Sequence, residues 1–223
     1  MKAAIDQEVH LKKILSQANF DLPPSQIHDL VAFYRLLLRA NEDQSLTRIT
    51  DFEAAAVKHF IDSLMPLKFI ALPKKLLDIG TGAGFPGIPL KIVRPDVEVI
   101  LAEHRPKRVA FLKAVVKELG LAKIGIFPRK VTPESFHAEV DGVITRAVED
   151  MAKTLIRIER FLVPGGLAIF LKGPTANEEC EVVAEDPELK DLYCLHLDQR
   201  YELPILNHER RLIVYERIDP DRI

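Results

Sequence analysis

The residues best suited to hold a ligand lie in one glycine-rich run. Gly80, Gly82 and Gly84 occupy alternate positions, and Asp78 precedes the first of them by two residues. Apolar residues lead into the run and a helix start follows it, which is the order of a strand ending in a turn. Glycine allows positive φ and lets a ligand approach the backbone without an intervening Cβ. Because amides at a helix start favour a negatively charged group, the run predicts a nucleotide-like ligand.

Two classes of ligand share this layout. A dinucleotide-binding turn has glycine at the sixth position, where this chain has Phe85. The pattern present, Asp-x-Gly-x-Gly-x-Gly, resembles the first motif of S-adenosylmethionine-dependent methyltransferases of the Rossmann-like class. Glu103 follows the next apolar run, where its carboxylate can accept bonds from a ribose diol. With the Leu-Val-Pro-Gly-Gly segment at 162–166, these features favour S-adenosyl-L-methionine; a tight turn without a ligand is the alternative for the glycines alone.

The elements that must position these residues follow two patterns. Residues 1–70 have few glycines and no strand alternation, so we expect helices there, including one at 26–40, a polar loop at 41–48 and a capping box at 50–53. From Lys75 onward short strands alternate with helices. We expect strands at 76–79, 97–102, 124–127, 140–144, 167–171, 193–197 and 212–216, and helices at 106–119 and 151–162.

This alternation predicts an α/β fold of the Rossmann-like, class I methyltransferase type. Its sheet is expected to be mostly parallel and doubly wound, with an antiparallel C-terminal strand. Residues 1–70 are expected to form an N-terminal helical extension packed on the catalytic fold of residues 71–223. The glycine turn follows the first strand, at the edge where such sheets bind ligands.

Composition narrows the class of protein. The chain has 223 residues and a net charge of −2, so any RNA site must be a local basic patch. Cys180 and Cys194 form no CxxC pair and are expected to be reduced thiols. The N-terminus does not read as a signal peptide, and no apolar run approaches the roughly 20 residues that span a bilayer. We therefore expect a cytoplasmic protein that does not enter a membrane.

Several longer motifs are more specific. They are Gly80-Thr-Gly-Ala-Gly-Phe-Pro-Gly-Ile-Pro-Leu90, His59-Phe-Ile-Asp62-Ser63-Leu64, Lys107-Arg108-Val-Ala-Phe-Leu112, Thr145-Arg146-Ala147 and Leu171-Lys172-Gly173. Together and in this order they resemble the RsmG family, also called GidB. The resemblance implies transfer of a methyl group from S-adenosylmethionine to N7 of one guanine in 16S ribosomal RNA. It implies free 16S rRNA or the small ribosomal subunit as partner. We expect no DNA partner, and we expect a monomer.

The same resemblance assigns roles residue by residue. Arg146 falls on the arginine expected at the active site, and Glu103 on the ribose-binding acid. The remaining cofactor contacts fall on Asp78, Gly80, Gly82, Gly84, Phe85, Val131 and Thr132, with Arg146 also beside the cofactor. Three positions depart from the family pattern: Ala40 replaces Trp, Ser45 replaces Asn before Leu-Thr, and Lys130-Val131-Thr132 replaces Arg-x-Glu. We expect the backbone amide of Thr132 to bond the adenine ring.

The implied chemistry requires positioning more than acid–base catalysis. Guanine N7 has a free lone pair and the methyl donor is a sulfonium cation, so an in-line approach is the main requirement. Arg146 follows the fourth strand, and we expect it to orient the base or the RNA backbone. A structural arginine paired with a nearby acid, such as Glu149, is the alternative. His59, Asp62 and Ser63 are expected to form a hydrogen-bonded joint between the extension and the catalytic fold, or to bind cofactor or RNA directly, and no metal site is expected.

The candidate RNA contacts are basic residues. Arg105, Lys107 and Arg108 cluster at a helix N-terminus, where cations oppose the helix dipole. We expect them to contact RNA phosphates, with solvated charge as the alternative. The patch is expected to extend to Arg129, Lys130, Arg210 and Arg211, and Lys172 is a further candidate on the substrate side. Two other functions remain open: a methyltransferase for a small molecule or protein, and a catalytically silent RNA-binding module.

Overall fold

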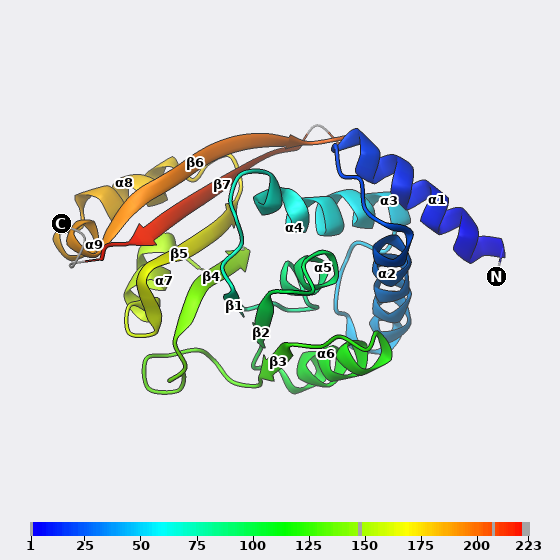
Figure 1. Cartoon of the computed structure of the whole chain (residues 1–223), viewed down its shortest axis with the longest axis horizontal. Helices are drawn as coiled ribbons and strands as arrows, with labels where there is room; N and C mark the ends of the chain where they lie inside the picture. Colours follow the sequence, from blue (N-terminus) through cyan, green and yellow to red (C-terminus); the bar gives the residue numbers. More distant parts are fainter. Residues whose placement is uncertain (1, 147–148, 207, 220–223) are drawn as a thin grey trace.

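The chain folds around one seven-stranded sheet (Figure 1). The computed structural model describes residues 2–146, 149–206 and 208–219, with the side chains of residues 2–5 left aside. In chain order the strands are β1 (Lys75–Ile79), β2 (Glu98–Ala102), β3 (Ile124–Phe127), β4 (Val140–Arg146), β5 (Leu162–Lys172), β6 (Tyr193–Leu203) and β7 (His208–Arg217). Across the sheet their order is β3-β2-β1-β4-β5-β7-β6. Strands β1 to β5 are parallel, and the β6–β7 hairpin is antiparallel. The predicted fold class is confirmed.

Strand β1 lies at the point where the strand order reverses. It pairs with β2 on one side and with β4 on the other, so that Ile79 lies beside both Ala102 and Thr145. In doubly wound sheets the crevice at such a point, outside the carboxyl ends of the strands, is where ligands bind. The glycine turn and Glu103 follow strands that end at this edge, and Arg146 is the last residue of β4.

Helices cover both faces of the sheet. Figure 1 shows α7 (Met151–Ile158), α8 (Asn177–Glu185) and α9 (Pro187–Leu192) on one side. The other side carries α1 (Lys2–Gln17), α2 (Pro24–Gln44), α5 (Gly87–Val93), α6 (Pro106–Glu118) and a further helix whose winding changes along its length. That helix comprises α3 (Phe52–Ala55), a π-helix (Ala56–Ile61), α4 (Asp62–Leu64) and a 3-10 turn (Met65–Lys68).

The alternation of side chains along the central strands divides the core into two clusters. Ile169 and Leu171 of β5 join the cluster that contains the N-terminal helices, whereas Ala168 and Phe170 join the cluster under α7, α8 and α9. Phe33 of α2 contacts the ring of Phe85 in the glycine turn at a centroid distance of 5.1 Å. The N-terminal helices thus share one hydrophobic cluster with the sheet, and the division of the chain at residue 70 stays a prediction.

Several predicted boundaries are wrong, each for a local reason. Helix α2 continues to Gln44, so the loop expected from residue 41 begins later. The next helix is capped by Asp51, whose Oδ1 accepts from the Ala54 amide at 2.8 Å, rather than by a box starting at Thr50. Strand β5 begins at Leu162, because the Pro-Gly-Gly segment continues as extended chain beside a bulge between Val140 and Gly142.

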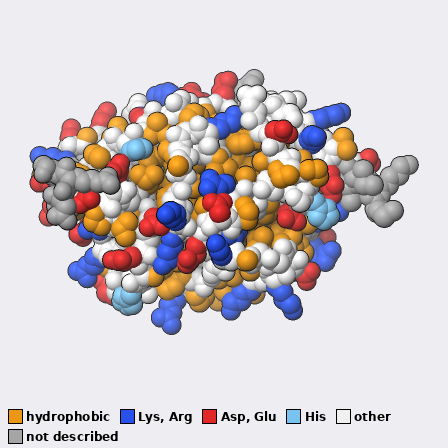
Figure 2. Space-filling view, viewed as in Figure 1, with side chains coloured by type: hydrophobic (Ala, Val, Ile, Leu, Met, Phe, Trp, Pro, Cys, Tyr) orange, Lys and Arg blue, Asp and Glu red, His pale blue; other side chains and the backbone are white. Residues whose placement is uncertain are grey.

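The surface has no single-sign field on the face drawn in Figure 2, where acidic and basic side chains are interspersed. This distribution agrees with the net charge of −2. Among the described residues, none of the helices combines the length and the apolar character needed to cross a membrane.

Candidate active site

The glycine run forms the turn between β1 and α5. Gly80, Gly82 and Gly84 have φ values of 69°, 62° and 98°, the left-handed region that favours glycine. A Cβ on Gly84 would lie 2.4 Å from Cδ1 of Ile88, whereas the nearest atom to one on Gly82 is a guanidinium nitrogen of Arg108, at 3.5 Å. Gly84 is therefore required for packing against α5, and Gly82 keeps an open surface on the ligand side.

A cavity of about 600 Å³ opens at the carboxyl edge beside this turn. Its volume lies in the range of small-molecule sites. The predicted site residues that line it are Gly80, Gly82, Phe85, Glu103, Arg105, Arg108, Val131 and Arg146. The wall opposite the sheet comes from Leu46, Thr47 and His59 of the N-terminal segment. Of these three, Leu46 and Thr47 were not among the predicted site residues.

Asp78 lies beneath the turn rather than on the cavity wall. Its side chain is fully buried, and Oδ2 accepts a hydrogen bond from the Gly87 amide at 2.8 Å. Burial raises the pKa of Asp78 to about 6, against the lowering effect of hydrogen bonds such as that from Gly87. This carboxyl group fixes the start of α5 and so holds the turn in shape.

Glu103 presents a buried carboxylate to the cavity. The side chain is 4% exposed, and Oε1 accepts from the Arg105 amide at 2.8 Å. The guanidinium of Arg108 lies 3.5 Å from Oε2, which is a long contact. A carboxylate has about four acceptor positions, so Glu103 retains capacity for two hydroxyl donors. The residues present therefore fit a nucleoside ribose at this end of the cavity.

Val131 and Thr132 differ in their access to the cavity. Val131 is buried and lines it, whereas Thr132 is not on its wall. The Thr132 amide donates to Oγ of Ser135 at 2.9 Å, closing a local turn. The structure therefore does not support the expected bond from this amide to an adenine ring, because Ser135 already accepts it.

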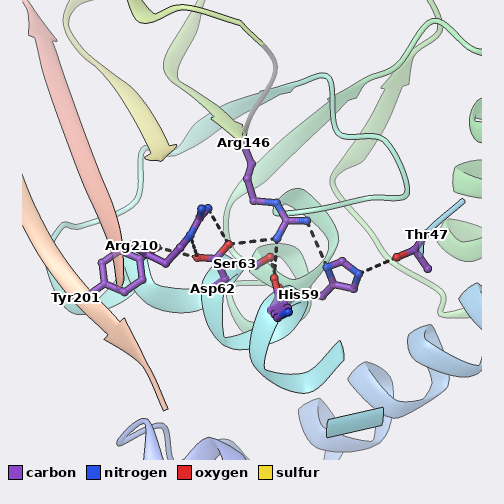
Figure 3. Close-up of polar contacts among 8 residues, drawn as sticks. Thr47, His59, Asp62, Ser63, Arg146, Tyr201 and Arg210 are labelled. Carbon is purple, nitrogen blue, oxygen red and sulfur yellow. Dashed lines mark hydrogen bonds and ion pairs between the residues drawn. The ribbon is translucent and has the colours of Figure 1, made fainter. Parts of the chain in front are cut away.

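Arg146 ends β4 and points across the cavity edge to the π-helix (Figure 3). Its Nη1 donates to the Lys58 carbonyl at 2.9 Å and to Oδ2 of Asp62 at 3.3 Å. Nη2 lies 3.5 Å from Nδ1 of His59. The guanidinium has five protons, so one proton on Nη2 and the proton on Nε remain for a ligand. Arg146 is thus paired with an acid, as the structural alternative expected, but that acid is Asp62. Glu149 instead bonds to Arg157 at 2.8 Å. Ala147 of the same motif lies outside the described residues.

Asp62 joins three parts of the fold, as Figure 3 shows. Besides Arg146 of β4, it accepts from the Tyr201 hydroxyl at 2.8 Å and from Nε of Arg210 at 3.1 Å. The Asp62 side chain is 3% exposed. The expected hydrogen-bonded joint is confirmed, and it reaches further than predicted because the β6–β7 hairpin takes part. The contribution of Ser63 among the described residues is a bond from its hydroxyl to the His59 carbonyl.

His59 lies against the glycine turn as a neutral ring. The imidazole stacks on Phe85 at a centroid distance of 4.4 Å and an interplanar angle of 19°. Burial, and secondarily the charge of Arg146, lowers the pKa of His59 to about 3. Its Nε2 lies 3.1 Å from Oγ1 of Thr47. The π-helical winding, a feature common at functional sites, contains both His59 and the carbonyl that Arg146 binds.

The predicted basic patch divides into two groups. Arg105 and Arg108 line the cavity mouth together with Arg129 and Lys130, and Lys107 is exposed outside it. The second group has structural partners instead: Lys172 with Glu179 at 2.7 Å, Arg210 with Asp62, and Arg211 with Asp198 at 2.5 Å. Lys172 and Arg211 are also at most 9% exposed. Burial and ion pairing therefore argue against the expected extension of the patch to these three residues.

Metal binding finds no support within the part of the chain that the structure describes, since it holds no group of three or more His, Cys, Asp or Glu residues suited to an ion. The site is instead a nucleoside-sized cavity with glycine, carboxylate and guanidinium groups on its walls.

The sheet order, the turn after β1 and the acid after β2 define the class I methyltransferase fold. The solved structure of the N-methyltransferase NodS from Bradyrhizobium japonicum WM9, in complex with S-adenosyl-L-homocysteine, matches with a TM-score of 0.55 and 14% identity. The match covers 84% of this chain and 99% of that one. At this identity the likeness shows the fold alone.

The family follows from sequence. The family model described as rRNA small subunit methyltransferase G matches residues 26–203, and the chain belongs to this family. It is 41% identical over 210 residues to ribosomal RNA small subunit methyltransferase G 2 of Syntrophobacter fumaroxidans, covering 94% of this chain but 42% of that protein. It is 43% identical over 209 residues to the protein of the same name from Bdellovibrio bacteriovorus, covering 93% and 81% respectively. The predicted family is confirmed.

Proposed function

We propose that this chain transfers a methyl group from S-adenosyl-L-methionine to N7 of a guanine in 16S ribosomal RNA. The observation that carries the proposal is a single cavity that combines the positive-φ glycine turn, the buried Glu103 carboxylate and the Arg146 guanidinium. The names of the relatives support the ribosomal substrate, and the family resemblance supports N7. We further propose that the enzyme acts as a cytoplasmic monomer on free 16S rRNA or on the small ribosomal subunit, without a DNA or membrane partner.

The cofactor-facing residues have distinct tasks. Gly80 and Gly82 give the ligand access to the backbone, and Glu103 accepts the ribose hydroxyls. Val131 offers an apolar surface for the purine ring of the cofactor. S-adenosylmethionine supplies the electrophilic methyl group, since its sulfur carries a positive charge.

The transfer itself requires no general base. The lone pair of guanine N7 forms the new N–C bond as the S–C bond breaks, and no proton leaves the purine. His59 is neutral and Asp62 is held in ion pairs, so the polar residues beside Arg146 serve its orientation. The two free protons of Arg146 then position the acceptor base or its phosphate. Arg105 and Arg108 contact RNA phosphates at the cavity mouth.

A labelling experiment tests this function. The protein is incubated with methyl-labelled S-adenosylmethionine and either small ribosomal subunits or free 16S rRNA, and the modified nucleotide is mapped. Label on N7 of a guanine supports the proposal, and RNA without label rejects it. Calorimetry with S-adenosylmethionine separates the rival functions, because a silent RNA-binding module would bind none.

An arginine substitution tests the assigned role. Arg146→Ala is expected to lower turnover at least tenfold while changing S-adenosylmethionine affinity far less, since the lost contact is to the acceptor. Arg160→Ala, which changes an exposed arginine in the turn after α7, is the matched control with unchanged turnover. Equal turnover of the Arg146 variant and the wild type would reject the role.

A further inference from the structure

Three hydrogen bonds hold Thr47, a loop residue at the cavity wall. Its amide donates to Oδ1 of Asn41 at 2.8 Å, which fixes the backbone. Its Oγ1 accepts from the Ile49 amide at 3.0 Å and lies 3.1 Å from Nε2 of His59, which fixes the side chain. The side chain is partly exposed and lines the cavity beside His59 and Arg146.

The bonds between Arg146, His59 and Thr47 run in one direction. A guanidinium can only donate, so Nδ1 of His59 is the acceptor for Arg146. The neutral imidazole then carries its single proton on Nε2 and donates it to Oγ1 of Thr47. This assignment follows from the donor table rather than from observed hydrogens.

The Thr47 hydroxyl consequently has a proton to give and no further capacity to accept. Two N–H groups, from Ile49 and His59, occupy its two lone pairs. Within the described residues no acceptor is recorded for the hydroxyl proton. Since Thr47 lines the cavity, this proton is available to an acceptor atom of whatever occupies it.

We propose that Thr47 determines the base specificity of the reaction by donating this hydrogen bond to the 6-oxo group of the target guanine. The inference rests on the proposed function. In guanine, N7 and O6 lie on the same edge and are both acceptors, whereas adenine has an amino donor in place of O6. The free groups on this wall, the Thr47 hydroxyl and two protons of Arg146, are all donors. An adenine would therefore place its amino group, a donor, against the donating hydroxyl of Thr47.

The proposal assigns Thr47 a role in orientation rather than in bond making. Positive charge enters the purine ring as N7 is methylated, so a donor at O6 is not strengthened in the transition state. The bond instead selects the base and fixes the angle at which N7 meets the methyl group. A lost or mismatched base-edge contact corresponds to about a 10- to 100-fold change in discrimination.

The test compares chemically altered acceptors in one RNA. The substrate carries guanine, 2-aminopurine or 2,6-diaminopurine at the target position, all of which keep N7. For the wild-type enzyme we expect kcat/KM for guanine to exceed that for either analogue at least tenfold. Equal values for guanine and 2-aminopurine would overturn the proposal without any variant. Wild-type enzyme that labels none of these RNAs, while binding S-adenosylmethionine, would instead reject the proposed function.

Two variants complete the test. Thr47→Val removes the hydroxyl at similar shape, and we expect it to lose most of the guanine preference while methylation of 2-aminopurine changes less than threefold. Thr47→Ser keeps the hydroxyl and should keep the preference. Equal losses on guanine and 2-aminopurine would mean a merely structural role. A weakened S-adenosylmethionine affinity with an unchanged guanine preference would mean that the hydroxyl serves the cofactor; either result overturns the proposal.

Discussion

Replacing Asp62 by asparagine tests the joint on which Arg146 depends. The Asp62 carboxylate accepts from Tyr201 at 2.8 Å, from Arg210 at 3.1 and 3.3 Å, and from Arg146 at 3.3 Å. The asparagine side chain has the same shape but no negative charge. Its NH2 group is a donor, as the guanidinium groups of Arg146 and Arg210 are, so it cannot accept their hydrogen bonds. Both arginines lose their common counter-charge, and among the described residues neither forms an ion pair with another carboxylate.

The size of the effect follows from burial. Removing one partner of a buried ion pair costs about 3–5 kcal/mol. The arginine side chains are 17% and 21% exposed, so they can regain part of their hydration, and the lower end, about 3 kcal/mol, applies. For a chain of this size that corresponds to a fall in Tm of about 6–12 °C. Turnover should fall at least tenfold, because Arg146 loses one of the two contacts that hold Nη1.

The assays are thermal unfolding, calorimetry with S-adenosylmethionine and methylation of the ribosomal substrate. Affinity for S-adenosylmethionine should change less than turnover, since Glu103 and the glycine turn do not contact Asp62. Glu209→Gln on the same hairpin removes a carboxylate from an exposed pair with Arg200 and should leave all three readouts near wild type. A folded Asp62→Asn protein with wild-type turnover would refute the claim that this joint positions Arg146.

Three further predictions concern the cofactor side of the cavity. Gly84→Ala should lower the free energy of unfolding by about 2–4 kcal/mol in urea titrations, because the new Cβ would be 2.4 Å from Ile88 at a φ of 98°; unchanged stability would contradict this. Glu103→Gln should weaken S-adenosylmethionine binding about tenfold in calorimetry with little change in Tm, since a charge-assisted bond becomes a neutral one. The Asp78 pKa is raised by burial from 3.8 to about 6, so the folded state holds this proton more tightly. The protonated Asp78 side chain therefore stabilises the folded state below pH 3.8, and this contribution to the free energy of unfolding, about 3 kcal/mol in the ligand-free protein, is lost as the pH rises through about 6. In unfolding titrations at different pH values, Asp78→Asn should flatten that part of the profile.

The sequence predicts those parts of the fold that depend on residue patterns within short segments. The strands around Asp78, Glu103 and Arg146 alternate with helices, so their order and their common carboxyl edge could be inferred from spacing alone. The glycine turn was recognisable because positive φ at alternate positions has a residue signature. The different roles of its glycines could not be predicted, because only the packing of Ile88 against Gly84 distinguishes a structural glycine from one that faces the ligand.

The features that sequence analysis missed depend on distant partners. Asp62 bonds to Tyr201 and Arg210, which are 139 and 148 residues away in the sequence. The residues around each partner give no indication of this pairing. For the same reason Arg211 was expected to contact RNA, although Asp198 on the adjacent strand holds it. The π-helical winding at Ala56–Ile61 has no composition signal. A helical period explains His59 and Ser63 on one side, but not the rotation that brings the Lys58 carbonyl to Arg146.

The two halves of the cavity have different structural origins, and this separates binding of the cofactor from placement of the acceptor. Gly80, Gly82 and Glu103 belong to the loops after β1 and β2, whose positions are fixed by the parallel sheet. Thr47 and His59 come from the N-terminal segment, to which Arg146 at the end of β4 also bonds. A perturbation of the N-terminal segment should therefore move the acceptor groups while the cofactor groups remain in place. For that reason variants at Asp62 and at Thr47 are expected to reduce turnover or base preference before they reduce S-adenosylmethionine affinity, whereas Glu103 variants should show the reverse order.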